Sequence, residues 1–92
     1  MAKELVLIET DSCVSCYGLE QEIQSILPEF DSLEFHIARS AEEAQPYLNL
    51  CSIDQLPALL LIDDNQVLGH LNGYQPAFIL EVWLQTLLKE GN

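Results

Sequence analysis

The apolar residues of this chain fall into blocks whose spacing predicts four β-strands. Residues 5–8 and 58–62 are short continuous apolar runs, which are typical of strands covered on both faces of a sheet. Residues 33–37 alternate between apolar and polar types and predict another strand. The turn-forming residues 63–65 separate the run at 58–62 from a strand at 66–71, so these last two strands are expected to form an antiparallel hairpin.

Three segments with helical spacing lie between and after these strands. Apolar residues recur every three or four positions from about Val14, and Pro28 ends that helix. Ser40 and Glu43 form a capping-box pattern, which predicts a short second helix. Residues 77–89 predict the last helix.

The predicted order of elements is strand, helix, strand, helix, strand, strand, helix. Because a helix connects the first two strands, we expect them to be parallel, whereas the last two are antiparallel. This order predicts an α/β fold, β-α-β-α-β-β-α, with a mixed four-stranded sheet and helices on both faces. A chain of 92 residues, 49% of them hydrophobic, fits a single domain over residues 1–92.

Two cysteines, Cys13 and Cys16, lie where the first strand ends and the first helix begins. The two intervening residues bring both sulfurs to one side of the first helical turn, within reach of a disulfide. The unpaired N–H groups of a helix N-terminus stabilise a thiolate, whereas the nearby acids Glu9, Asp11 and Glu20 oppose a further negative charge. The pattern therefore predicts dithiol redox chemistry, with a Cys13 pKa that is only modestly lowered.

The three cysteines also allow other interpretations. The pair can be an inert feature of the helix start, or Cys13, Cys16, Cys51 and one histidine can supply four zinc ligands. Zinc sites usually bring their ligands in two close pairs, and the second pair is missing, so we predict no metal. Cys51 is expected to be a buried small side chain, with a regulatory or intermolecular thiol as the alternative. His36 and His70 are expected to be structural or surface residues.

Charge narrows the choice of partners. Lys and Arg number 3 against 15 Asp and Glu, which gives a net charge of -12. Such a surface repels phosphate groups, so neither nucleic acid nor an anionic membrane is an expected partner, while a basic protein is allowed. No apolar run approaches the roughly 18–20 residues that span a bilayer, and the N-terminus lacks a signal-peptide pattern. A cytoplasmic location is expected.

The cysteine pair, with Leu56-Pro57 opening the third predicted strand and Gly73 preceding the last helix, resembles the thioredoxin-like superfamily in a minimal form. The resemblance implies a small thiol–disulfide oxidoreductase that needs no cofactor. Cys13 would attack a substrate disulfide, and Cys16 would release the product by closing the intramolecular bridge. The resemblance also implies that Pro57 is cis and lies against the cysteine pair.

The same resemblance assigns substrate-binding positions. Leu56 would offer backbone groups to an extended peptide, and Ser12 and Gly73 would border the same site. The sequence departs from the family at several places: Ser12 stands where thioredoxins carry Trp, and Leu7 stands where they carry a buried Asp. The stretch at 72–76 also lacks the Gly-Gly-Asp pattern by which glutaredoxins hold glutathione.

The predicted partners are a disulfide-containing protein substrate or a reductase. The alternative function is a protein-interaction module without redox turnover, acting through the last helix. That helix is apolar most of the way round, which exceeds what one sheet face can cover. We expect its core face to be Ile79, Val82, Trp83 and Thr86 or Leu87. The remaining apolar residues of this helix are expected to face a partner protein or a second copy of the chain; they are Phe78, Leu80, Leu84 and Leu88. In the second case the protein would be a homodimer that pairs through helix 77–89.

Overall fold

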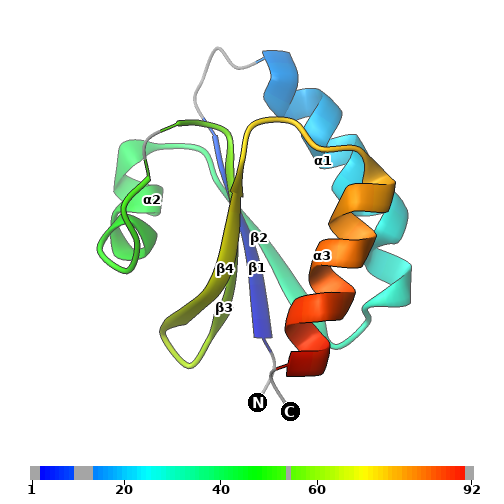
Figure 1. The fold of residues 1–92 in the computed structure, drawn as a ribbon. Helices are drawn as coiled ribbons and strands as arrows, with labels where there is room; N and C mark the ends of the chain where they lie inside the picture. The colour runs from blue at the N-terminus through cyan, green and yellow to red at the C-terminus, as the bar shows by residue number, and fades with distance from the viewer. Residues whose placement is uncertain (1–2, 10–13, 54, 91–92) are drawn as a thin grey trace.

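A four-stranded sheet separates two layers of helices (Figure 1). The computed structural model describes residues 3–9, 14–53 and 55–90. Its elements follow the predicted order: β1 (Lys3–Ile8), α1 (Val14–Ile26), the 3-10 turn η1 (Leu27–Glu29), β2 (Leu33–Ala38), α2 (Ala41–Leu48), β3 (Ala58–Asp63), β4 (Gln66–Asn72) and α3 (Ala77–Glu90). In the part of the chain described, no helix is long and apolar enough to cross a membrane.

The strand pairing confirms the predicted mixed α/β sheet. The order across the sheet is β2-β1-β3-β4, with β1 and β2 parallel and the other two pairs antiparallel. Ile8 at the end of β1 pairs with Ala38 at the end of β2 and with Ala58 at the start of β3. The carboxyl ends of β1 and β2 and the amino end of β3 therefore lie side by side at the same end of the sheet.

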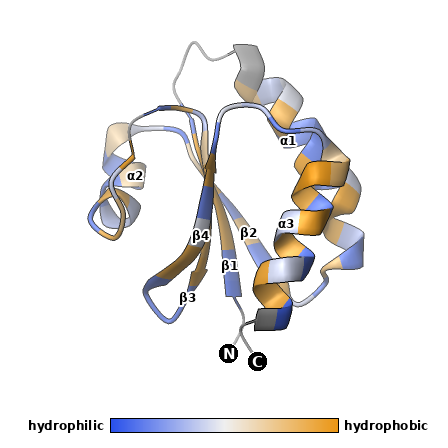
Figure 2. Cartoon of the chain, in the orientation of Figure 1, coloured by the Kyte–Doolittle hydropathy of each residue, from blue (hydrophilic) through white to orange (hydrophobic). Residues whose placement is uncertain are grey.

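Alternate residues of the central strands feed two separate cores. Leu5 and Leu7 point to the face covered by α1 and α3, whereas Val6 and Ile8 point to the face covered by α2. All four are at most 1% exposed, which is why β1 is a continuous apolar run rather than an alternating one. Burying each such side chain stabilises the fold by roughly 1.5–3 kcal/mol relative to leaving it in water. Figure 2 accordingly shows long hydrophobic (orange) stretches along the strands and on α3.

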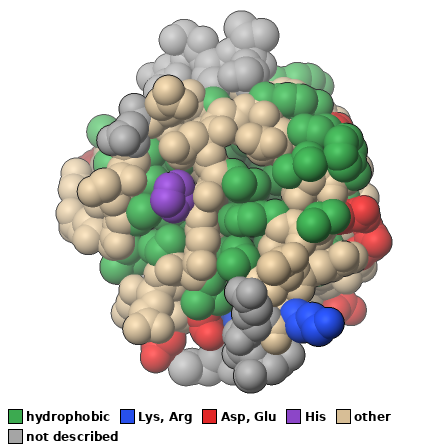
Figure 3. All heavy atoms as spheres, viewed as in Figure 1, with side chains coloured by type: hydrophobic (Ala, Val, Ile, Leu, Met, Phe, Trp, Pro, Cys, Tyr) green, Lys and Arg blue, Asp and Glu red, His purple; other side chains and the backbone are tan. Residues whose placement is uncertain are grey.

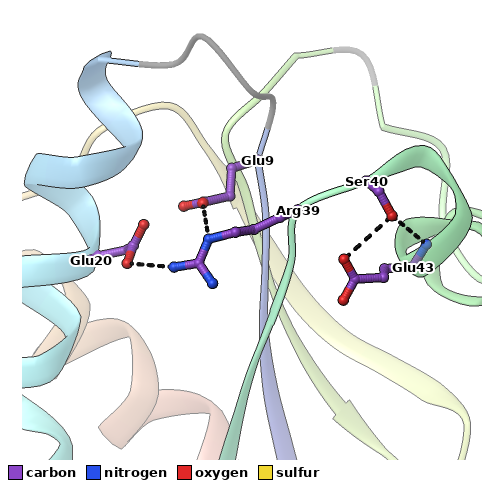
Figure 4. A network of polar contacts seen from close by, with 5 residues as sticks. All are labelled: Glu9, Glu20, Arg39, Ser40 and Glu43. Carbon is purple, nitrogen blue, oxygen red and sulfur yellow. Dashed lines mark hydrogen bonds and ion pairs between the residues drawn. The ribbon is translucent and has the colours of Figure 1, made fainter.

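Local sequence signals set the turn and the cap that the sequence predicts. Asp64 and Asn65 both have positive φ (52° and 65°), the backbone of a type I′ turn, whose twist matches that of the flanking strands. At α2, the Ser40 hydroxyl accepts a hydrogen bond from the Glu43 N–H at 3.1 Å and lies 3.3 Å from the Glu43 carboxylate (Figure 4). This capping arrangement satisfies a backbone donor that the first helical turn leaves unpaired.

The orientation of α3 corrects the sequence prediction. Leu80 and Leu84 are fully buried, while Val82 is 60% exposed and Phe78 is 66% exposed. The prediction was therefore wrong for Leu80, Leu84 and Val82, although Phe78 is exposed as expected. Trp83 and Leu87 are partly buried against the core, as expected, and Leu88, which was expected on the outer face, packs there with them. Ile79 was expected in the core but is 37% exposed.

The cause is that α3 packs against α1 as well as against the sheet. Leu80 and Leu84 share one core cluster with Leu19 and Ile23 of α1. A Glu22 carboxylate of α1 also accepts a hydrogen bond from the Ala77 N–H at 2.9 Å, which fixes the start of α3. Two apolar stripes on α3 were compatible with the helical period, and the contact with α1 selects the one that is buried.

Candidate active site

Four chain segments converge at the carboxyl end of β1. The pairing of Ile8 with Ala58 brings Pro57 beside the end of β1, and the pairing of Ala58 with Asn72 brings Gly73 beside Pro57. Helix α1 begins at this same end of the sheet (Figure 1). The position outside the carboxyl ends of parallel strands is where α/β sheets commonly bind ligands.

Pro57 forms the buried centre of this convergence. Its side chain is less than 2% exposed, and its peptide bond with Leu56 is cis. The Pro57 carbonyl accepts a hydrogen bond of 2.7 Å from the Gly73 N–H. Gly73 has φ of +78°, a conformation that costs a side-chain-bearing residue free energy, which explains glycine at this turn. Leu56 stands outside this core with 41% of its surface exposed.

The structure describes only part of the predicted cysteine site. Cys16 lies in the first turn of α1 and is 2% exposed. Cys13 and Ser12 lie outside the described residues, and their roles remain predictions. Leu56, Pro57 and Gly73 lie close together, and their substrate-binding roles also remain predictions.

One of the acids that the sequence analysis places near the cysteine pair, Glu9, is buried at this end of the sheet. Glu9 directly follows β1, and its side chain is only 7% exposed. The Arg39 Nε lies 3.2 Å from one Glu9 oxygen, and its Nη2 lies 3.2 Å from a Glu20 oxygen on α1 (Figure 4). Arg39 thus ties the end of β1 to the helix that carries Cys16, with Glu20 one turn after Cys16.

The parallel register explains why Glu9 meets Arg39. Each residue follows the last residue of its strand, Ile8 and Ala38, which are paired. The Glu9 N–H also donates a hydrogen bond of 3.0 Å to the Ala38 carbonyl. A sequence signal for this contact was available: Glu9 and Arg39, one of only three Lys or Arg residues, come just after two strands that are predicted to be parallel.

Glu9 has a strongly shifted acidity. Burial, followed by hydrogen bonding and like charge from the neighbouring Glu20, raises the pKa of Glu9 from 4.5 to about 7. Arg39 acts in the opposite direction but does not cancel these effects. Glu9 can therefore exchange a proton near neutral pH, as a general acid or base must.

This shift makes stability depend on pH. Between pH 4.5 and about 7 the folded protein keeps a proton on Glu9 that the unfolded chain has released, so the Glu9 contribution to stability falls as pH rises through this window. We expect this effect to lower the free energy of unfolding of the wild type by roughly 1–3 kcal/mol across the window, and we expect Glu9→Gln to abolish that decrease. Urea denaturation at pH 4.5, 6 and 7.5 measures it.

The matched control is Glu42→Gln, which changes the net charge equally at an exposed position of α2. That variant should keep the wild-type pH dependence. Parallel stability curves for wild type and Glu9→Gln would contradict the assignment of a proton to Glu9.

A cavity of about 470 Å³ opens beside Glu9 on the α2 side of this end of the sheet. Its wall is mainly apolar, and Leu56 forms part of it. The apolar wall includes Ala44, Leu48, Ile53 and Leu56, and Glu9 and Arg39 line the polar side.

Among the residues that the structure describes, no group of candidate metal ligands includes a cysteine. Within the described ranges, the one group of three ligand-type side chains close enough to share an ion is Glu4, Glu34 and His36, on the sheet surface. Neither Cys16 nor Cys51 belongs to it. The zinc arrangement considered from the sequence is therefore not assembled by the described residues.

Comparison with solved structures defines the class of fold. A thioredoxin from Trypanosoma brucei brucei matches 96% of this chain and 76% of its own with a TM-score of 0.76 at 22% identity. A Fasciola hepatica thioredoxin matches 91% of this chain and 80% of its own with a TM-score of 0.71 at 17% identity. A malarial protein matches 96% of this chain and 99% of its own with a TM-score of 0.76 at 11% identity.

No protein-family model matches the sequence, and no curated protein matches it. The structural matches are nevertheless extensive in both directions. The chain therefore has an α/β thioredoxin-like fold, as the sequence predicted. At these identities the similarity establishes the fold, and the chemistry has to be argued from the residues of this chain.

Proposed function

We propose that this protein is a small thiol–disulfide oxidoreductase that exchanges a Cys13–Cys16 dithiol with the disulfide of a protein or a small molecule. One observation carries the proposal. The strand register gathers Leu56, Pro57 and Gly73 at the end of the sheet where the helix bearing Cys16 begins. An open thiol at that helix start would face a surface suited to an extended substrate.

In the proposed reaction, the Cys13 thiolate attacks one sulfur of the substrate disulfide. The substrate S–S bond breaks, a mixed disulfide forms, and the first substrate sulfur leaves as a thiolate. Cys16 then attacks the Cys13 sulfur, which closes the intramolecular disulfide and releases the second substrate thiol. The dithiol loses two electrons, and the substrate disulfide gains them.

Substrate binding is proposed at Leu56. Its backbone precedes Pro57 at the open end of the sheet, and its side chain is 41% exposed at the rim of the 470 Å³ cavity. An extended peptide placed along this rim can bury an apolar side chain in the cavity. The proposed substrate is therefore a peptide segment with an apolar residue close to its disulfide.

Glu9 is proposed to handle the proton that Cys16 releases. It is the buried acid at this end of the sheet among the described residues, and Arg39 links it to Glu20, one helical turn from Cys16. A group with a pKa of about 7 can take a proton from a thiol and return it to solvent at neutral pH.

Equilibration with dithiothreitol or glutathione at known ratios tests the proposal directly. We expect Cys13 and Cys16 to form a bridge whose fraction follows the ratio with a two-electron slope, as measured by alkylation and mass spectrometry. A protein in which no bridge forms under oxidising conditions would refute the redox function.

The exposed stripe of α3 favours a second candidate, a protein-interaction module. Phe78 and Val82 lie one helical turn apart and are more than half exposed, and Glu81 lies between them in sequence. Figure 3 shows hydrophobic side chains gathered over this part of the molecule with acidic ones beside them. Such a surface fits a partner with an apolar centre and a basic rim, rather than a second copy carrying the same net charge of -12.

A further inference from the structure

A cysteine and a histidine meet beside the core on the α2 side of the sheet. The Cys51 sulfur lies 3.8 Å from the His70 Nδ1, within hydrogen-bond distance for sulfur. Cys51 is half-buried and His70 is exposed, so reagents in solvent can reach the pair. The sulfur also lies 3.7 Å from the Ser52 carbonyl, which is a second possible acceptor for its proton.

An irregularity in β4 brings the histidine to this face. Leu61 pairs with Gly69 while the next residue, Ile62, pairs with Val67, so Leu68 is an extra residue in the ladder, the pattern of a β-bulge. In a regular strand, residues three apart point to opposite faces. Here Val67 packs on the α2-side core, and His70 contacts Cys51 beside that same core.

The residues around the bulge also pack on the opposite face of the sheet, which α1 and α3 cover. Leu68 and Leu71 pack against the core under α1 and α3. A Cβ on Gly69 would lie 2.7 Å from a Leu87 methyl of α3, so a larger residue here would require the Leu87 side chain to move. The position of His70 is therefore fixed by the fold. Bulges often serve to re-aim a side chain in this way.

We propose that Cys51 and His70 form a second thiol site that takes up low-molecular-weight disulfides as a mixed disulfide. A thiolate next to an imidazole that accepts its proton is the reactive form of cysteine. In the tautomer with hydrogen on Nε2, the His70 Nδ1 is free to accept the thiol proton. The proposal rests on the contact between Cys51 and His70 and does not depend on the proposed function.

The reaction balances without a further reagent. The Cys51 proton passes to His70, and the sulfur attacks one sulfur of the small disulfide, whose S–S bond breaks. One half remains on Cys51 as a mixed disulfide. The other half leaves as a thiolate and takes up the proton held by His70. The Cys51 sulfur is oxidised and the departing sulfur is reduced, and an added thiol reverses the step.

The test uses full-length protein with Cys13→Ala and Cys16→Ala, which leaves Cys51 as the sole cysteine. The probe is 2-hydroxyethyl disulfide, which is neutral and so unaffected by the net charge of the protein. Mass spectrometry follows adduct formation at pH 7 in this parent, in His70→Asn, and in the matched control His36→Asn on β2. We expect His70→Asn to react roughly tenfold more slowly than the parent, and His36→Asn to react within about twofold of it.

Two further measurements separate a chemical from a structural role. In concentrated guanidinium all three proteins should react at one rate, because the contact with His70 is gone. Peptide mapping of treated wild-type protein should show the adduct on Cys51, even if the double-alanine parent folds poorly. Equal rates in the parent and His70→Asn under native conditions, or no adduct on Cys51 in the wild type, would overturn the proposal.

Discussion

Replacing Cys13 with serine should abolish disulfide reduction. A serine hydroxyl is not ionised at neutral pH and cannot form a mixed disulfide, so we expect the rate to fall by roughly a thousandfold or more. Reduction of a peptide disulfide with dithiothreitol as the electron donor measures the effect. The assay also decides between the two candidate functions: an interaction module would lose nothing on this substitution, because its wild-type form would not reduce the disulfide.

Two companion variants sharpen this result. Cys16→Ser should leave Cys13 able to attack but unable to release its product, so a covalent complex with the substrate should accumulate in non-reducing electrophoresis. Cys51→Ser, which removes the third thiol, should reduce the peptide at the wild-type rate. Equal activity in Cys13→Ser and wild type would place the chemistry elsewhere.

The sequence was sufficient for the sheet because its strongest signals are local. The runs at 5–8 and 58–62 are apolar since both faces of β1 and β3 are covered, and this burial is visible as composition. The hairpin follows from Asp64 and Asn65, two residues that tolerate positive φ. The parallel pairing of β1 and β2 follows from the connecting helix alone.

The features that the sequence did not predict depend on contacts between distant segments. Glu9 is charged and follows a strand, so its neighbours in sequence suggest an exposed loop. Its burial follows from meeting Arg39, thirty positions away, through the parallel register. Likewise, the pairing of His70 with Cys51 requires a bulge in β4 that no periodicity reveals, because the adjacent residues Val67 and Leu68 are both apolar and so do not mark which face each takes.

The buried face of α3 is a third feature that the local pattern did not determine, and it yields the largest expected effect on stability. Leu84 is fully buried between α1 and the sheet, so Leu84→Ala should lower the free energy of unfolding by about 2–5 kcal/mol, through lost apolar burial and the cavity left behind. Small domains have total stabilities of roughly 5–15 kcal/mol, so this loss is a large share of the whole.

Val82→Ala is the matched control, since it removes apolar atoms from the same helix at a position that is 60% exposed. It should change stability by about 0.5 kcal/mol or less. Urea denaturation followed by circular dichroism measures both variants, and Leu80→Ala should behave like Leu84→Ala. The reverse ranking would mean that α3 is turned so that Val82 faces the core, as the periodicity alone first indicated. The stripe with Phe78 and Val82 would then be unavailable to a partner, and the interaction surface proposed on α3 would be lost with it.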